Sequence, residues 1–207
     1  MDYQKHWSHI YETKAVDDVS WYQVRPETSL AYIQQTGIAS NAAIIDVGSG
    51  ASTLVDYLVD AHYTDITLLD LSAEALEIAK ENSQINNVTG KINFILSDMF
   101  SNISEQKFDI IISNPPYIAE KEFQELEKEL LFEPRQALVA KEEGLFFYKQ
   151  IADNAKNYLN QNGLITVELN ANIPDAVTRV FTDRGYKKIK IIKDYSGLER
   201  VLVLKNG

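Results

Sequence analysis

The stretch Ile44-Ile45-Asp46-Val47-Gly48-Ser49-Gly50 is an apolar strand that runs directly into a turn with two glycines. A second apolar segment, 66–69, ends at Asp70. Asp70 follows Gly50 by 20 residues, the separation expected between a glycine turn that binds a nucleoside and the carboxylate that binds its ribose. Position 53 is Thr, so the third glycine that a dinucleotide requires is missing. The pattern therefore predicts an α/β sheet that binds a nucleoside-containing cofactor other than a dinucleotide.

A second motif, Asn114-Pro115-Pro116-Tyr117, follows the apolar run 108–113, which is typical of a buried parallel strand. An Asn at the carboxyl end of such a strand faces the crevice where open α/β sheets bind ligands. Pro115 holds Asn114 extended, and prolines lack N–H groups, so the turn presents mainly acceptors. The Asn114 side-chain oxygen and the Pro115 carbonyl suit a planar –NH2 group whose nitrogen gains positive charge. Taken alone, the motif is equally consistent with a rigid strand-to-loop turn.

Strands and helices alternate after residue 42, which favours a doubly wound α/β sheet. The expected strands are 43–47, 65–69, 91–96, 108–113, 164–169, 186–192 and 199–205. The expected helices lie near 51–60, 72–85, 120–131, 144–160 and 174–184. Ser72 can cap the second helix, and the short connection between the last two strands suits an antiparallel pair. We expect a catalytic domain over residues 41–207, preceded by an aromatic-rich helical segment over residues 1–40.

The order of the glycine turn, Asp70, a strand that ends at Asp98 and the Asn-Pro-Pro-Tyr turn resembles the class I S-adenosylmethionine-dependent methyltransferases. The resemblance covers about residues 40 to 205. It implies a Rossmann-like fold with a seven-stranded, mostly parallel sheet and an antiparallel C-terminal strand, and it implies S-adenosyl-L-methionine as the cofactor. The cofactor-binding residues it implies are Asp46, Gly48, Gly50, Asp70, Leu71, Asp98, Met99 and Asn114. The catalytic residues it implies are Asn114, Pro115, Pro116 and Tyr117.

These roles differ along the cofactor. By the resemblance, Asp46 and the two glycines would line the methionine end, Asp70 would accept both ribose hydroxyls, and Asp98 would hold the adenine. For Asp46 and Asp98, a carboxylate that caps a turn or a helix is the alternative interpretation.

Four segments narrow the resemblance, from about residue 71 to the C-terminus, to the release-factor glutamine methyltransferases. They are Asn114-Pro115-Pro116-Tyr117-Ile118, Phe132-Glu133-Pro134-Arg135-Gln136-Ala137-Leu138, Glu143-Gly144-Leu145 with Tyr148, and Asp194-Tyr195-Ser196-Gly197-Leu198-Glu199-Arg200. That family methylates the side-chain amide nitrogen of a glutamine, which implies a protein substrate such as a peptide-chain release factor. Arg135 fits a structural ion pair with a nearby Glu equally well. Glu168, at a strand end, either orders the substrate loop or pairs with a Lys.

The chain also departs from that family. Only about forty residues precede the first strand, where bacterial members carry a helical substrate-recognition domain. These residues, and the chain up to about residue 70, resemble a different group of class I methyltransferases, some of which act on protein lysines or small molecules. Ala140-Lys141-Glu142 replaces a glycine-containing turn, and Leu169-Asn170 replaces an expected Ile-Gly. We interpret the chain as a composite, a natural recombinant or an engineered chimera.

The N-terminal segment has its own predicted role. Its aromatic residues provide apolar area that a short polar arm would not need, so we expect them to pack over the cofactor as a lid. These residues are Trp7, Tyr11, Trp21 and Tyr22. A place in the core of the domain is the alternative for all four.

The composition is that of an ordinary globular protein, with 207 residues, 45% of them hydrophobic and 24% charged. No apolar run approaches the length of a membrane span, and the N-terminus lacks a signal-peptide core, so we expect a cytoplasmic protein with no membrane partner. The chain has no Cys and three His, so we expect no metal site. Its net charge of −10 and the expected lack of a basic run make nucleic acid an unfavourable partner.

Alternatives to glutamine methylation stay open at this point. An N6-adenine-type nucleic-acid methyltransferase would use the same Asn-Pro-Pro-Tyr turn on an exocyclic amine. A protein-lysine or small-molecule methyltransferase would follow the N-terminal resemblance. A cofactor-binding chimera with little catalysis would result if the two halves were not selected together.

Overall fold

The computed structural model describes residue 11, residues 23–125 and residues 135–207. The chain forms two compact units, Met1–Ser104 and Glu105–Gly207. No helix in the described part of the chain is long and apolar enough to cross a membrane.

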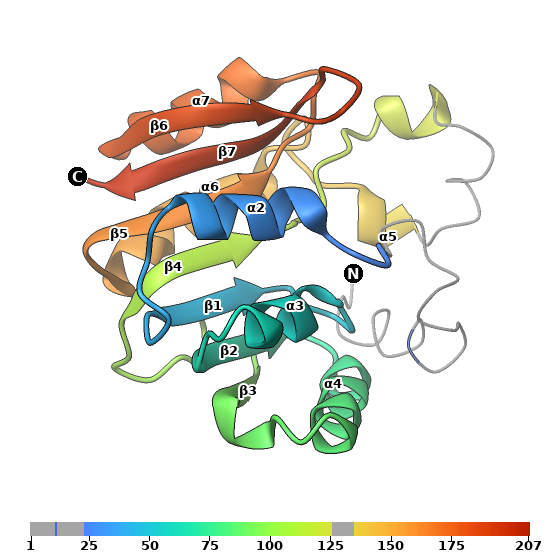
Figure 1. Cartoon of the computed structure of the whole chain (residues 1–207). Coiled ribbons are helices and arrows are strands. Elements are labelled where there is room, and N and C mark those ends of the chain that lie inside the picture. Colours follow the sequence, from blue (N-terminus) through green and yellow to red (C-terminus); the bar gives the residue numbers. More distant parts are fainter. Residues whose placement is uncertain (1–10, 12–22, 126–134) are drawn as a thin grey trace. The chain divides into compact units, whose positions relative to one another are not determined.

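The first unit contains three parallel strands in the order β3-β2-β1 (Figure 1). Its elements are α2 (Glu27–Gln35), β1 (Ala43–Val47), α3 (Leu54–Asp60), β2 (Asp65–Asp70), α4 (Ala73–Ile85), the 3-10 turn η2 (Thr89–Lys91) and β3 (Ile92–Leu96). The register places Val47 opposite Leu69 and Asp70 opposite Leu96. The carboxyl ends of the three strands therefore lie along one edge of this sheet.

Local chemistry explains where these helices begin. The hydroxyl of Ser72 accepts a hydrogen bond from the Ala75 N–H at 3.2 Å and caps α4 as expected, with Glu74 in the first turn. Residues before β1 are tied to α3, because the Tyr57 hydroxyl donates to the Val24 carbonyl at 3.0 Å. Residues 23–40 thus belong to the first unit together with the strands that follow them, and the proposed domain boundary at residue 40 stays a prediction.

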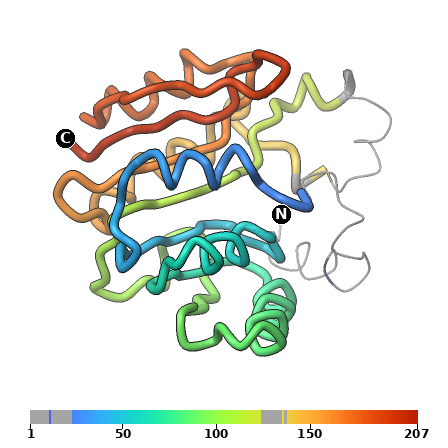
Figure 2. The backbone as a smooth tube through the Cα atoms, viewed as in Figure 1, coloured from blue at the N-terminus to red at the C-terminus, as the bar shows by residue number. Residues whose placement is uncertain are grey.

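The second unit contains four strands in the order β4-β5-β7-β6, and the tube in Figure 2 passes through them along the chain from green at β4 to red at β7. Strands β4 and β5 are parallel, and β7 runs antiparallel to both β5 and β6. The strands are β4 (Phe108–Ser113), β5 (Leu159–Glu168), β6 (Tyr186–Lys193) and β7 (Glu199–Asn206). The helices are η3 (Glu122–Glu125), α5 (Arg135–Leu138), α6 (Phe146–Asn154), η5 (Ala155–Asn157) and α7 (Pro174–Thr182).

The fold class expected from the sequence is confirmed: the described residues form an α/β structure with seven strands, mostly parallel, and an antiparallel C-terminal strand. Central strand positions such as Ile44, Ile66, Ile110 and Ile165 are fully buried. This burial explains the nearly continuous apolar runs of β1, β2 and β4, since strands covered on both faces do not alternate.

The structure corrects the boundary between one helix and the strand after it. The helix expected over 144–160 ends earlier, and β5 begins at Leu159 because Leu159 is buried and pairs with Phe108. A register shift follows, so the Asn-Gly pair expected to end the helix lies inside β5. The strand expected over 91–96 is confirmed as β3, which ends at Leu96, two residues before Asp98. The helix expected over 120–131 is described only as η3, and its remainder lies outside the described residues.

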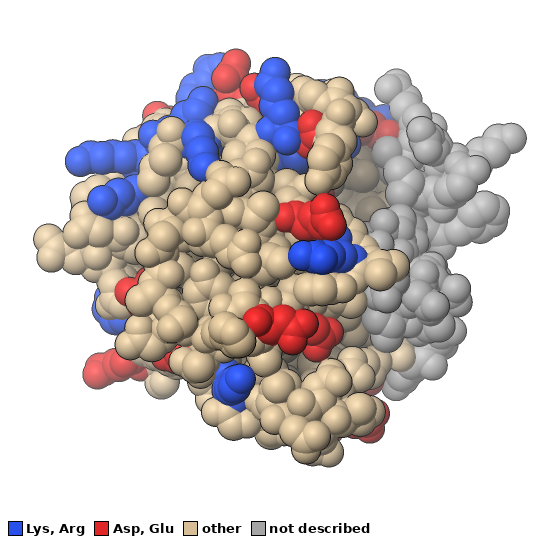
Figure 3. All heavy atoms as spheres, in the orientation of Figure 1, with Lys and Arg blue, Asp and Glu red and all other residues tan. Residues whose placement is uncertain are grey.

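Strand β6 corrects the expectation that the chain lacks a basic run. It is the edge strand of the second unit and carries Lys187, Lys188, Lys190 and Lys193. In Figure 3, Lys and Arg side chains gather at the upper left, over β6 and α7. Lysines on an edge strand oppose pairing with a second chain, which accounts for this cluster without a nucleic-acid partner.

Candidate active site

The glycine turn is folded over the end of β2. The N–H groups of Gly48 and Ser49 both donate to the Leu69 carbonyl, at 2.8 and 3.1 Å. The N–H of Gly50 donates to Asp70 Oδ2 at 2.7 Å. Gly48 has φ +76° and Gly50 has φ +53°, a left-handed conformation that favours glycine. The spacing of 20 residues thus has a direct structural cause, because the turn is hydrogen-bonded to the predicted ribose carboxylate.

Asp70 is buried at the carboxyl end of β2, with 6% of its surface exposed. Its Oδ1 accepts from the Ser72 N–H at 2.8 Å, and its Oδ2 accepts from Gly50. Burial raises the pKa of Asp70, while backbone N–H groups of Ser72, Gly50 and Leu71 lower it. A carboxylate offers about four acceptor positions, so one position is left beyond these three backbone donors, and a further hydroxyl would have to share.

Asp46 is the second buried carboxyl of this edge, on β1. Burial, and then the negative charge of Asp70, together raise the pKa of Asp46 to about 7. No Lys, Arg or His among the described residues lowers the pKa of Asp46 or of Asp70. Two buried carboxyls without a compensating cation favour a positively charged ligand group, because opposite charge would restore the ionised form.

Asp98 and Met99 are connected to the same edge through Ser97, which the sequence motifs did not indicate. The N–H of Ser97 donates to the Asp70 carbonyl at 2.9 Å, and the Ser97 hydroxyl donates to the Met99 carbonyl at 2.8 Å. Asp98 itself is exposed, and Met99 takes φ +48°. No sequence signal marks Ser97 as this anchor, because its burial is known only from the structure.

The residues of this edge fit S-adenosylmethionine. Two buried side-chain polar atoms of the described residues lack a hydrogen-bond partner, Ser49 Oγ and Thr67 Oγ1. Ser49 lies between the two glycines of the turn, where an unpaired buried hydroxyl is costly unless a ligand satisfies it. An unpaired hydroxyl in the turn that follows Asp46 and bonds to Asp70 suits a ligand that carries both a cationic group and hydroxyls.

Tyr11 is the described member of the predicted lid, and it contacts this turn. A Cβ atom on Gly50 would collide with the Tyr11 hydroxyl, and the backbone of Ala51 hydrogen-bonds to it. Burial and the charge of Asp70 raise the pKa of Tyr11. Trp7, Trp21 and Tyr22 lie outside the described residues, so the lid itself stays a prediction.

A pocket of about 310 Å³ opens between α3, α4 and β3 in the first unit. Its lining includes Ala51, Ser52 and Thr53 of the glycine turn together with Asn82 of α4. None of the candidate residues Asp46, Asp70 or Asp98 lines it, so its chemistry differs from that of the edge described above.

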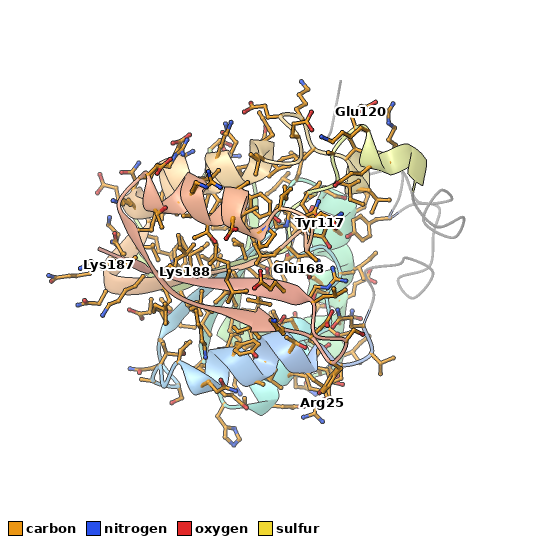
Figure 4. All side chains as sticks on the ribbon, turned by 90° about the horizontal axis from the view of Figure 1, so that it is seen from above. Arg25, Tyr117, Glu120, Glu168, Lys187 and Lys188 are labelled. Carbon is orange, nitrogen blue, oxygen red and sulfur yellow. The ribbon has the colours of Figure 1, made fainter. Side chains whose placement is uncertain are left out.

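In the second unit, the Asn-Pro-Pro-Tyr turn follows β4 directly, as predicted. Asn114 is exposed and Pro115 is buried. The Tyr117 hydroxyl donates to Glu168 Oε1 at 2.9 Å, and Figure 4 shows the two side chains next to each other. Burial raises the pKa of both groups; the charge of Glu168 raises that of Tyr117 further, whereas Tyr117 and Arg200 lower that of Glu168. Of the two interpretations of Glu168, the structure supports contact with the turn.

Arg135 has the structural role that we held open. It forms an ion pair with Glu120, and its guanidinium lies 5.5 Å from the centre of the Phe123 ring. The preceding residues Phe132, Glu133 and Pro134 of that motif lie outside the described residues. The part of the chain that the structure describes contains no group of three or more His, Cys, Asp and Glu that could hold a metal ion.

The chain matches known proteins over most of its length. The family model described as Methyltransferase small domain matches residues 28–193. A bifunctional methyltransferase of Rickettsia bellii is 40% identical over 161 residues, which cover 77% of this chain and 29% of that protein. A release factor glutamine methyltransferase of Lactococcus lactis is 34% identical over 204 residues, which cover 96% of this chain and 74% of that protein.

A solved methyltransferase of Pyrococcus furiosus has the same fold, with a TM-score of 0.65 at 17% identity over 99% of each chain. The match to the Lactococcus lactis protein crosses residue 70, the point where we expected one family to give way to another. The composite origin therefore stays a prediction. The chain spans less than a third of the Rickettsia bellii protein and about three quarters of the Lactococcus lactis protein. The Rossmann-like fold is confirmed, and the chain belongs to the methyltransferase small-domain family.

Proposed function

We propose that this chain is an S-adenosylmethionine-dependent methyltransferase that methylates the side-chain amide nitrogen of a glutamine in a protein, with a peptide-chain release factor as substrate. The observation that carries the proposal is the Asn114–Tyr117 turn, which follows a buried strand and is fixed by Glu168. The match over 204 residues to a release factor glutamine methyltransferase supports the same reaction.

The first unit would hold the cofactor. Asp46 and the glycine turn would line the methionine end with its cationic groups, Asp70 would accept the ribose hydroxyls, and Asp98 with Met99 would lie at the adenine. S-adenosylmethionine, when bound, supplies an electrophilic methyl group on a sulfonium. The chain's own contribution is position and electrostatics, since two buried carboxyls favour positive charge and exclude anions.

The second unit would hold the glutamine amide. An amide nitrogen is a poor nucleophile because its lone pair is delocalised into the carbonyl. The Asn114 side-chain oxygen and the Pro115 carbonyl would accept both N–H groups and favour the pyramidal nitrogen that attacks. Two prolines in succession leave no N–H donor between Asn114 and Tyr117 to compete for these acceptors.

The deciding experiment is mass spectrometry of release factors incubated with the protein and isotope-labelled S-adenosylmethionine. One labelled methyl group on a glutamine side chain is the expected result. The matched control is the same release factor with that glutamine replaced by asparagine, which should stay unlabelled. A labelled lysine or labelled RNA in parallel reactions would contradict the proposal, as would cofactor binding without any product.

A further inference from the structure

The Tyr117 end of the turn is held at two points by the residues that end and follow β5. The Tyr117 hydroxyl donates to Glu168, and the Tyr117 carbonyl accepts from Asn170 Nδ2 at 3.2 Å. Glu168 thus holds the side chain of Tyr117, and Asn170, two positions further along the chain, holds its backbone. Both the side chain and the backbone of Tyr117 are therefore held in place.

Asn170 is the centre of this arrangement and is 5% exposed. Its Nδ2 also donates to Glu122 Oε2 at 3.1 Å, and its Oδ1 accepts from the Asn172 N–H at 2.9 Å. Its own N–H donates to the Tyr148 hydroxyl at 3.3 Å. Every polar group of the Asn170 side chain has a partner, and a fully satisfied buried network fixes geometry more firmly than single contacts do.

Gly144 also lies close against the Tyr117 carbonyl. Gly144 has φ +84°, and a Cβ atom there would collide with the Tyr117 carbonyl oxygen. The next residue is held by backbone bonds, from the Ile118 N–H to Leu138 at 2.8 Å and from the Ala140 N–H to Ile118 at 2.9 Å. In contrast, Asn114 at the other end of the turn is exposed. The turn is therefore anchored at its Tyr117 end and presents its Asn114 end.

We propose that Asn170 and Glu168 are positioning residues, which fix Tyr117 and thereby orient the Asn114 and Pro115 acceptors for methyl transfer. This inference rests on the proposed function. Asn170 stands where the resemblance to the glutamine family leads us to expect a glycine, which has no side chain to make this contact. We call the contacts of Glu168 and Asn170 with Tyr117 the brace. A displacement of about 1 Å at reacting groups can cost on the order of 100-fold in rate, so a brace of this kind acts on turnover.

The first test compares Asn170→Ala with Asn154→Ala. Asn154 is the matched control because its side chain donates to the Gln150 carbonyl within α6. We expect Asn170→Ala to lower kcat by about 10-fold to 100-fold, with KM and Kd for S-adenosylmethionine unchanged. Asn154→Ala should keep the wild-type kcat. A folded Asn170→Ala protein with wild-type kcat would overturn the proposal, and so would a rise in KM alone.

The second test is a double-mutant cycle on the Tyr117–Glu168 bond. Tyr117→Phe and Glu168→Ala each remove it, so the double variant should have no lower kcat than the worse single variant. Glu168→Gln keeps an oxygen acceptor and should restore most of the activity lost in Glu168→Ala. Asp153→Ala, which breaks the surface pair with Arg184, is the charge control. Independent losses that multiply in the double variant, or no rescue by Gln, would contradict the assigned role.

An activity-independent readout separates this inference from the proposed function. Amide hydrogen exchange at Ile118 and Ala140 reports the anchoring of the turn directly, because both N–H groups bond across it. Asn170→Ala should speed exchange at these two sites and leave β6 unchanged. If wild-type protein methylates no glutamine, the proposed function fails while faster exchange still supports the brace. Unchanged exchange in Asn170→Ala would refute the brace whatever the substrate is.

Discussion

The two units hold their functional groups by different means. In the first unit, Asp70 is bonded by backbone N–H groups of Gly50 and Ser72 at 2.7 and 2.8 Å. In the second unit, Tyr117 is held by side chains that lie 51 and 53 residues away in the sequence. Backbone donors at a strand end follow from the chain path itself, whereas distant side chains follow only from the complete fold.

The two units also differ in how their buried carboxyl groups are stabilised. Asp46 and Asp70 are buried together, and burial and like charge raise the pKa of Asp46. Burial also raises the pKa of Glu168, but Tyr117 and Arg200 oppose that shift. A positively charged ligand group would therefore stabilise the buried carboxyls of the first unit. In the second unit, Tyr117 and Arg200 already stabilise the ionised form of Glu168.

The largest expected effect tests the second unit. Asn114→Ala removes one acceptor of the developing positive charge, so turnover should fall by about 10²–10³-fold. Cofactor affinity, measured by calorimetry, should change far less, because the buried carboxylates belong to the first unit. Wild-type turnover in folded Asn114→Ala would show that the turn takes no part in the reaction. It would also contradict the proposal that the first unit binds the cofactor and the second binds the amide.

Replacement of Asp70 makes the corresponding test of the first unit. Asp70→Ala should weaken S-adenosylmethionine binding by about 1–3 kcal/mol, since it removes a charged acceptor from the ribose hydroxyls. It also frees the Gly50 N–H, so amide exchange at Gly50 should accelerate. Asp65→Ala, at the other end of β2, is the control. If calorimetry gave the wild-type Kd for a native-like Asp70→Ala protein, Asp70 would be no part of the cofactor site.

The sequence predicted the first unit more completely than the second, for a physical reason. Motif spacing captured Gly50 and Asp70 because a single crossover connects them, and their hydrogen bond fixes that spacing. Strand alternation captured the fold because buried parallel strands are continuously apolar. Asn170 was noted only as a departure from a family pattern, since no local signal links it to Tyr117. Ser97 and Ser49 were missed because a lone Ser is ordinary until its burial is known.

Gly144 offers a smaller test of how tightly the second unit is closed. Gly144→Ala places a methyl group against the Tyr117 carbonyl and forces an unfavourable φ of +84°, so we expect a loss of about 2 kcal/mol in unfolding free energy. Gly197→Ala is matched in backbone, with φ +81°, but meets open space. Urea denaturation should therefore show a smaller loss for Gly197→Ala. Equal losses would mean that backbone strain alone, and not closure against Tyr117, accounts for the effect.

A pH titration tests the claim that the first unit lacks compensating charge. The pKa of Asp46 is about 7 in the folded chain, above its ordinary value of 3.8. The folded chain therefore holds this proton more tightly than the unfolded chain does, and protonation of Asp46 stabilises the fold. This contribution to stability is fully present at low pH and is lost as pH rises through about 7. Between about pH 6 and pH 8, we expect Asp46 to lower the unfolding free energy by about 1.4 kcal/mol.

The measurement is urea denaturation of wild type and Asp46→Asn across that range. The difference between their unfolding free energies should grow with pH and level off above about pH 8, because the Asn variant has no proton to lose. A constant difference would show that Asp46 is already ionised in the folded chain, and that a cation or donor compensates it.

The smallest expected effect concerns Tyr11, which joins the N-terminal segment to the glycine turn. Tyr11→Phe keeps the ring but removes the hydroxyl that bonds to Ala51 beside Gly50 and Asp70. A net hydrogen bond contributes about 0.5–1.5 kcal/mol, so cofactor affinity should fall by up to about tenfold if the lid interpretation holds. The unfolding free energy should fall by the same small amount or less.

Tyr195→Phe is the control for Tyr11→Phe, because Tyr195 is 93% exposed in the second unit. If Tyr11 belongs to the core instead, Tyr11→Phe should lower stability while the Kd for S-adenosylmethionine, corrected for the folded fraction, stays at the wild-type value. Deletion of residues 1–25 sharpens the distinction: a lid loses affinity without unfolding the sheet, whereas a core segment unfolds the first unit. Quenching or a shift of Trp fluorescence on cofactor addition would place Trp7 or Trp21 at the same turn, because these are the two tryptophans of the chain.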